Sequence, residues 1–183
     1  MQPLLQWNKL IGDGGLYTWF NLPVTSEMLY PCSNLFYIDH NIRVLVDHKV
    51  IGMYGLATEG PGTDVFSLRS YMLARCMWRP ETNGREAVQE FCRLYYGEEA
   101  APFVFKYLAD IHAHQKHRTR DENHRPDKPD TFSGPVLHRA NALLARAEDS
   151  AATRVQKLRV AELRMQPWYF MVDAAYGLSL IHI

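Results

Sequence analysis

The sequence lacks a long hydrophobic run, an excess of charge of one sign and a cysteine pattern. No run of about 18 apolar residues is present, so we expect no membrane-spanning segment. Twenty Lys and Arg residues balance twenty Asp and Glu residues, which removes the basic field that draws proteins to nucleic acid or acidic lipid. The first residues, MQPLLQWNKLIGDGG, have neither the basic stretch nor the apolar core of a signal peptide. We therefore expect neither nucleic acid nor a membrane as a partner, and the compartment stays open.

Metal and cofactor sites are also poorly supported by the sequence. The three cysteines, Cys32, Cys76 and Cys92, are odd in number and lack metal-ligand spacing, so we expect buried thiols. Four histidines lie between residues 112 and 124, but the Lys and Arg residues around them would repel a cation. The basic cluster Lys116 to Arg120 is offset by the two carboxylates that follow it. We predict a solvated surface there, with no metal and no cofactor.

The first part of the chain alternates strands with helices. The runs LYTWFNL (16–22) and VIGMYGL (50–56) are rich in β-prone residues and predict buried strands. Helical spacing follows each strand, over residues 34–49 and 68–79. After a turn at Asn83-Gly84 it continues over residues 88–97 and 101–114. This alternation implies parallel strand pairing with helical crossovers. A (β/α)8 barrel needs eight strands in about 250 residues, so a chain with two strands is at most a piece of one.

The sequence suggests four segments. We expect residues 1–117 to form the last βα units of an incomplete TIM-type barrel, and residues 118–135, which are polar and Pro-rich, to be a linker. Amphipathic stripes on either side of Asp149-Ser150 predict an appended α-helical hairpin over residues 136–177. Residues 178–183, LSLIHI, resemble translated sequencing-adapter DNA from metagenomic assemblies, the alternative being a genuine β-tail.

Several motifs together resemble a known family. The order LYTWFNL, PCSNLFYIDHNIRVLVDHKVIGMYG, PGTDVFSLRSYMLARCMWRPE and EFCRLYYGEEAAPFVFKYL is similar to the bacterial "domain of unknown function 4838" family. Members of that family are similar to (β/α)8 glycoside hydrolases of the alpha-glucuronidase and hexosaminidase type. The resemblance runs from about Leu16 to Asp173. It implies an α/β fold, helix-rich overall: the C-terminal part of a (β/α)8 barrel followed by a helical hairpin.

The resemblance also directs attention to carboxylates, since glycoside hydrolysis usually needs two across the scissile bond. Acidic residues of the family often follow the strand tryptophan and end the next strand. Here Phe20 and Gly55 hold those places. Glu59 lies in the following loop and is the one candidate catalyst, the alternative being a solvated loop residue. Asp64 fits a helix cap better, and Glu27 has no supporting pattern, so the catalytic pair is not identified.

Aromatic residues give the candidate substrate contacts. Trp19 and Asn21 lie near the C-terminal end of the first strand, and Tyr54 lies near that end of the second. Alternation along a strand places Tyr17, Trp19 and Asn21 on one face. Trp19 or Tyr54 would stack on a pyranose ring and Asn21 would bond its hydroxyls; the alternative is that both rings fill a barrel interior.

Three functions therefore compete. The chain is a fragment of a glycoside-hydrolase-like protein that supplies carbohydrate contacts, a non-catalytic glycan-binding member of the same fold, or a structural helical module. We favour the first, with an oligosaccharide or polysaccharide as partner and with the oligomeric state open. A stable monomeric product would favour the third, and aggregation through unpaired strand edges would favour the first two.

Overall fold

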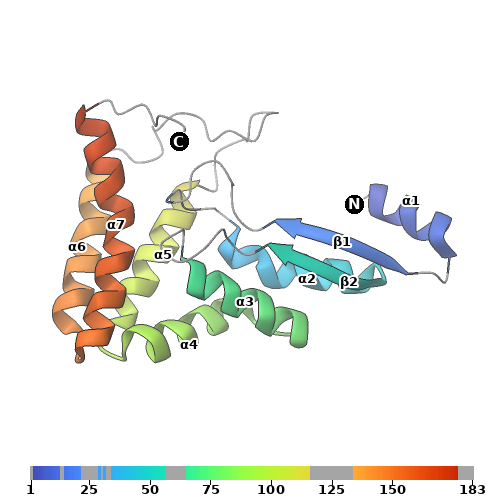
Figure 1. Cartoon of the computed structure of the whole chain (residues 1–183), viewed down its shortest axis with the longest axis horizontal. Helices are drawn as coiled ribbons and strands as arrows, with labels where there is room; N and C mark the ends of the chain where they lie inside the picture. The colour runs from blue at the N-terminus through green and yellow to red at the C-terminus, as the bar shows by residue number, and fades with distance from the viewer. Residues whose placement is uncertain are drawn as a thin grey trace.

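The protein is mainly helical, with a small parallel sheet near one end and a pair of long helices at the other (Figure 1). The computed structural model describes residues 2–12, 15–21, 29, 31, 34–56, 65–115 and 134–176. Along the chain, the elements are α1 (Gln2–Ile11), β1 (Leu16–Asn21), the 3-10 helix η2 (Leu35–Tyr37), α2 (Ile38–Asp47), β2 (Val50–Leu56), α3 (Phe66–Trp78), α4 (Gly84–Tyr96), α5 (Ala101–Gln115), α6 (Gly134–Ser150) and α7 (Arg154–Tyr176). None of these helices, as far as the structure describes them, is long and apolar enough to cross a lipid bilayer.

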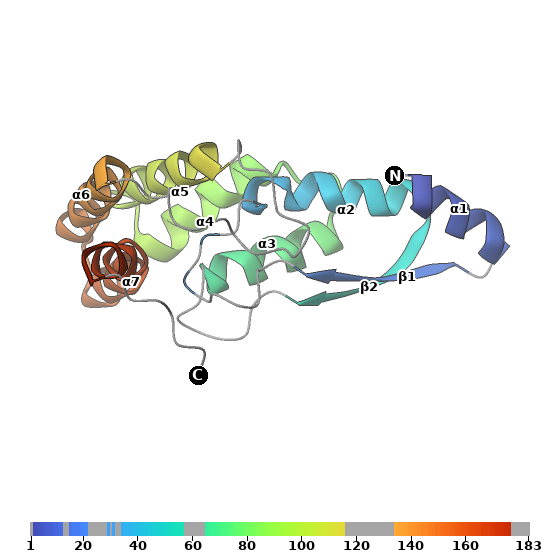
Figure 2. The same cartoon turned by 90° about the horizontal axis from the view of Figure 1, so that it is seen from above.

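The predicted strands pair in parallel, but the predicted burial of the strands and the predicted barrel are wrong. No side chain described on either strand is buried, because helices cover only part of one face of the sheet. Trp19 pairs with Tyr54 and Asn21 with Leu56 in the register of β1 and β2. Within the described residues these two strands form the whole sheet, whereas a TIM barrel needs eight. Of the seven α-helices in the described part of the chain, α1, α2 and α3 contact the sheet, whereas α6 and α7 lie at the other end of the molecule (Figure 2). The alternation of strand and helix was read correctly, but the helices mostly pack on one another and do not form a ring around a barrel.

The helix ends follow local sequence rules. Asn83 precedes α4, and its side-chain oxygen accepts hydrogen bonds from the backbone N–H groups of Arg85 and Glu86. Gly97 ends the same helix at φ 97°, a backbone conformation that glycine adopts without strain. At the start of α7, Thr153 and Gln156 each accept a hydrogen bond from the other's backbone N–H, which forms a capping box.

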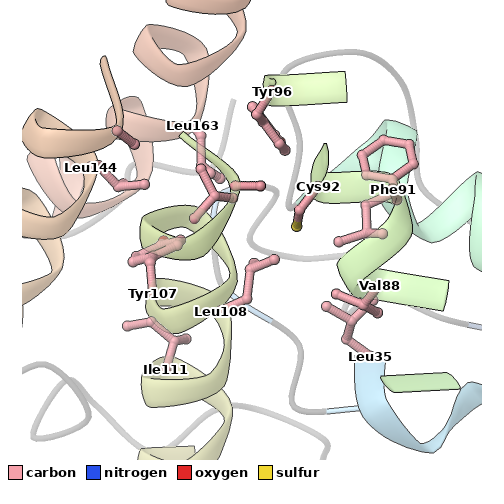
Figure 3. Close-up of a cluster of buried hydrophobic side chains, with 14 of the residues drawn as sticks. Leu35, Val88, Phe91, Cys92, Tyr96, Tyr107, Leu108, Ile111, Leu144 and Leu163 are labelled. Atoms are coloured by element: carbon pink, nitrogen blue, oxygen red, sulfur yellow. The ribbon is translucent and has the colours of Figure 1, made fainter. Parts of the chain in front are cut away.

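One hydrophobic core runs through the helices from η2 to α7. Its members include Val88, Tyr107, Leu144 and Val160, each from a different helix and each almost completely buried. Figure 3 shows side chains of α4 and α5 meeting those of the two C-terminal helices. The core is therefore continuous between the two parts predicted as 1–117 and 136–177. Most of the predicted linker, and residues 178–183, lie outside the described residues.

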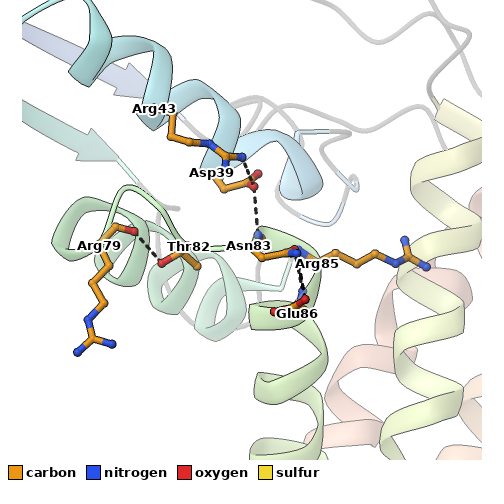
Figure 4. A network of polar contacts seen from close by, with 8 residues as sticks. Asp39, Arg43, Arg79, Thr82, Asn83, Arg85 and Glu86 are labelled. Carbon is orange, nitrogen blue, oxygen red and sulfur yellow. Dashed lines mark hydrogen bonds and ion pairs between the residues drawn. The ribbon is translucent and has the colours of Figure 1, made fainter.

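A buried carboxylate joins α2 to the start of α4 (Figure 4). Asp39 accepts a hydrogen bond of 3.1 Å from the backbone N–H of Gly84 and one of 2.7 Å from Arg43. A negative charge at a helix N-terminus is favourable because the N–H groups there lack helical partners. A Cβ added at Gly84 would lie 2.7 Å from the Asp39 carboxyl carbon, so the close approach depends on glycine.

Helix α7 has apolar residues on two faces. Val160, Leu163 and Phe170 are buried in the core, whereas Val155 and Leu158 are exposed. The amphipathic stripe that the sequence shows after Asp149-Ser150 includes Val155, Leu158, Val160 and Leu163. The structure divides that stripe between a face packed on α4 and α6 and a face open to solvent.

Candidate functional site

The exposed face of the β1–β2 sheet carries three aromatic side chains. Trp19 and Tyr54 are register partners on neighbouring strands, and their ring centroids lie 5.0 Å apart in an edge-to-face arrangement at 73°. Trp19 is 68% exposed and Tyr54 59%. Edge-to-face pairs of this kind contribute about 0.5–1.5 kcal/mol beyond simple burial. The contact therefore holds both rings in place while leaving much of each in water.

Tyr17 extends this aromatic face toward the start of β1. Its ring lies over Gly52, its register partner, where an added Cβ would come within 2.2 Å of Tyr17 Cε1. Tyr17 itself is 77% exposed. The missing side chain at Gly52 makes room for the ring to lie against the neighbouring strand. We refer to Tyr17, Trp19 and Tyr54 together as the aromatic face.

The opposite face of the sheet is covered by the protein at Met53 and Gly55, whereas Ile51 near the start of β2 is 61% exposed. Met53 packs against the hydrophobic core, and a Cβ added at Gly55 would lie 2.4 Å from Leu73 Cδ2 on α3. Position 55 is where the family resemblance suggested a carboxylate. In this fold that position is directed at α3 and away from the aromatic face. Phe20 stands at the other position where the family often has an acidic residue, and it pairs with Gly55 in the strand register.

The remaining predicted site residues are only partly placed. Asn21 is the last residue of β1, but its side chain lies outside the described part of the chain. Glu59, Asp64 and Glu27 also lie outside it. The structure thus brings Trp19 and Tyr54 together, and the role of Glu59 stays a prediction. Neither strand contains Asp or Glu, so the aromatic face has no carboxylate of its own on β1 or β2.

No metal centre is present among the described residues, where no three His, Cys, Asp or Glu side chains are grouped closely enough. His112 is buried in α5 and its ring packs edge-on against Phe36 at 5.0 Å. The side chain of His114, together with His117 and His124, lies outside the described residues. His112 therefore has the surroundings of a core residue.

Two cysteines are buried thiols, as the sequence predicted. Burial raises the pKa of Cys76 to about 11 and that of Cys92 to about 12. The thiolate is the nucleophilic form of cysteine, and a raised pKa keeps it scarce at neutral pH. These two residues therefore have the properties of core residues and not of catalysts.

A polar cluster between α3 and α4 was not predicted. Arg75 contacts the Tyr71 hydroxyl and forms an ion pair of 2.8 Å with Glu90. The hydrogen bond from Arg75 lowers the pKa of Glu90, and the pKa of Arg75 is raised in turn. Both side chains are about one-third exposed, so solvent screens the pair. The cluster joins α3 and α4 at the surface. In the sequence, only the four-residue spacing of Tyr71 and Arg75 indicated a contact, because Glu90 lies on the other helix.

The described helices enclose a small cavity and, at another place, a larger groove. The cavity, of about 40 Å³, lies between α3, α4 and α7 and is lined in part by Ser67, Tyr95 and Arg159. It holds a few water molecules at most, whereas ligand sites usually measure about 300–1,000 Å³. The groove, of about 630 Å³, runs between α5 and α6, but floor residues such as Tyr107 are almost fully buried. The cavity is too small for such a ligand. The groove has a ligand-sized volume, but it does not present exposed aromatic rings as the aromatic face does.

Comparison with known protein families identifies the family of this chain. The family model described as "Domain of unknown function (DUF4838)" matches residues 1–109, which is more than half of the chain. The chain belongs to this family. No curated protein and no solved structure shows significant similarity to it.

The DUF4838 match contains α1, both strands and the helices up to the middle of α5. It therefore includes Trp19, Tyr54 and Glu59. The resemblance had been expected to extend to Asp173, whereas the matched range ends before α6. Family membership is shown for the half of the molecule that carries the aromatic face, and the family description names no activity.

Proposed function

We propose that this DUF4838 protein binds carbohydrate through the aromatic face of its β1–β2 sheet. The observation that carries the proposal is the pair of exposed rings of Trp19 and Tyr54, held in contact on adjacent strands. Apolar side chains of this size are normally buried, and an exposed aromatic cluster is typical of an interaction site. A pyranose ring has an apolar C–H face that packs on indole or phenol rings.

Backbone geometry supports a preformed surface. Both rings project from paired strands, and the covered face of the sheet is packed closely on α3 at Gly55 and Leu73. A rigid support lowers the entropy lost on binding. Tyr17 lengthens the surface along β1, so more than one sugar unit can be contacted. An oligosaccharide or polysaccharide is therefore the proposed partner, with no cofactor required for binding.

Hydrolysis is the second part of the proposal and concerns a longer parent protein. The resemblance to glycoside hydrolases, together with the lack of a carboxylate on either strand, suggests that this chain supplies sugar contacts while at least one catalytic carboxylate lies elsewhere in the parent. Glu59 is the one candidate catalyst in the chain. In the intact parent, Glu59→Gln is expected to lower kcat/KM for glycoside substrates. An unchanged kcat/KM would remove Glu59 from the mechanism.

The binding test uses the purified chain and affinity electrophoresis through gels containing xylan, cellulose derivatives, chitosan, pectin or starch. We expect at least one polysaccharide to retard the protein. Trp19→Ala and Tyr54→Ala should each weaken binding about tenfold, since about 1.4 kcal/mol of lost contact corresponds to that factor. Trp78→Ala is the matched control, because Trp78 is 84% exposed but lies at the end of α3.

The outcomes separate the candidate functions. Retardation that is lost in Trp19→Ala and kept in Trp78→Ala supports the aromatic face as the site. Equal retardation of all variants moves the sugar site away from the sheet. No retardation by any polysaccharide removes the carbohydrate proposal and leaves the structural helical module.

A further inference from the structure

Helix α7 presents a second apolar face to solvent. Leu158 is 59% exposed, Met165 48%, Trp168 44% and Val172 46%, although all four are large apolar residues. The other side of the same helix is already buried against α6 and α4 through Val160, Leu163 and Phe170. The exposed residues are thus surplus to the core of the chain.

These residues follow a regular spacing. Leu158, Ala161, Met165, Trp168 and Val172 lie three, four, three and four residues apart. Apolar residues repeating every 3.5 residues form the seam of a coiled coil, in which one helix packs along another. Pro167 is buried and therefore lies on the opposite side of α7 from this seam. We refer to these five residues as the α7 seam.

Part of the seam is held in position before any partner binds. Trp168 Nε1 donates a hydrogen bond of 2.9 Å to Asn141 Oδ1 on α6. Arg164 lies over the Trp168 ring at 4.6 Å and also contacts Glu148 of α6. The indole is therefore fixed at the edge of α6, which reduces the entropy cost of forming an interface.

The charged residues beside the α7 seam are placed to form ion pairs between two copies of the chain. Taking Leu158 and Ala161 as positions a and d of a heptad, Lys157 occupies position g and Glu162 position e. In a parallel pair of helices, position g of one helix faces position e of the next heptad on the other. Lys157 would then meet Glu162 of the second copy, and symmetry would repeat the pair. Both are exposed, and no ion pair of either is found among the described residues.

We propose that the α7 seam is a homodimer interface, in which α7 of two copies of this chain pack side by side in parallel. The symmetry is twofold, so each copy uses the same surface. The partner is a second copy of this chain because, with the two helices parallel and in register, Lys157 of each copy faces Glu162 of the other. The inference does not depend on carbohydrate binding, since Figure 1 shows the sheet and α7 at opposite ends of the molecule.

The first test is the mass of the full chain in solution, measured by sedimentation velocity over a wide range of concentration. We expect the species to change from 21.2 kDa to twice that mass as concentration rises. Met165→Glu places a charge in the centre of the seam and should weaken the dimer more than about tenfold. Met77→Glu is the matched control, because Met77 is similarly exposed at 43% on α3.

A charge exchange tests the register and the parallel direction. Lys157→Glu and Glu162→Lys should each weaken the dimer, and the double variant should restore it because the ion pairs form again with reversed signs. Oxidation of Ala161→Cys should link two copies, since position d meets its own counterpart in a parallel pair. A monomer at every concentration overturns the proposal. A dimer unaffected by Met165→Glu, or a double variant no tighter than the single ones, also overturns it.

Discussion

At the scale of single residues, the aromatic face depends on what is absent beside it. Gly52 leaves space for the Tyr17 ring, and Gly55 lets Leu73 of α3 approach the sheet. Gly52 therefore makes room for a ring on the exposed face, and Gly55 allows α3 to pack on the other face. A methyl group at Gly55 would force Leu73 to move and disturb the packing that holds the strand bearing Tyr54.

Residue identities predicted some of this site and missed the rest. Strand alternation correctly placed Tyr17 and Trp19 on one face, and the register then brings Tyr54 beside Trp19. The sequence did not show whether that face is open, because exposure depends on which side α3 covers. The Tyr17–Gly52 contact was also missed, because a glycine in a strand has several explanations.

The buried thiol of Cys92 makes stability depend on pH in the alkaline range. Its pKa is about 12 in the folded protein and about 8.5–9 when unfolded, so between these values only the unfolded chain loses the proton. Stability contributed by this group is complete below pH 8.5 and decreases as pH rises toward 12. The slope from one proton is at most about 1.4 kcal/mol per pH unit.

Cys92→Ala is therefore expected to make the free energy of unfolding fall less steeply above pH 9 than in the wild type. Urea unfolding at several pH values measures the slope, which separates titration from the pH-independent cost of the substitution. Cys76→Ala should act in a narrower window, since the pKa of Cys76 is about 11. Parallel slopes in wild type and Cys92→Ala would contradict the buried-thiol explanation.

At the scale of elements, local rules performed well. The strands at residues 16–21 and 50–56 and the helices that follow them were predicted to within a few residues, because β-prone runs, helical spacing and Pro or Gly stops coincide there. Helix α1 was missed. Leu4, Trp7 and Ile11 have the three- and four-residue spacing of a helix face, so the signal for this helix was present in the sequence.

The cap of α4 gives a direct test of an element. Asn83→Ala removes the oxygen that accepts from the Arg85 and Glu86 N–H groups and should lower the free energy of unfolding by about 1 kcal/mol. Asn83→Asp keeps an acceptor and should retain most of the stability. Chemical unfolding followed by circular dichroism measures both. A loss in Asn83→Asp as large as in Asn83→Ala would show that the cap is not the cause.

At the scale of the whole molecule, sequence pattern failed where long-range assembly decides. A strand, a helix and a second strand occur equally in a barrel and in a small sheet beside a helical bundle. The difference lies in how many strands join and which helix faces meet, and neither is encoded in local periodicity. The second apolar face of α7 was missed for the same reason. The sequence shows a single apolar stripe, and only the packing of α7 shows which of its residues are buried and which are exposed.

The continuous core predicts a single unfolding transition. Leu144 of α6 is completely buried against residues of other helices, so Leu144→Ala should cost about 2–5 kcal/mol. Circular dichroism and tryptophan fluorescence should shift together to lower urea concentration. Leu94→Ala, on an exposed part of α4, is the matched control and should change stability by less than about 0.5 kcal/mol. Two separate transitions would favour independent units at 1–117 and 136–177.

The pairing of β1 with β2 also has a consequence for the order of folding. The two strands are separated in the chain by η2 and α2, so their contacts close a long loop, whereas each helix forms from neighbouring residues. Closing such loops slows folding relative to local helix formation. The aromatic face is thus expected to assemble after the helices that support it.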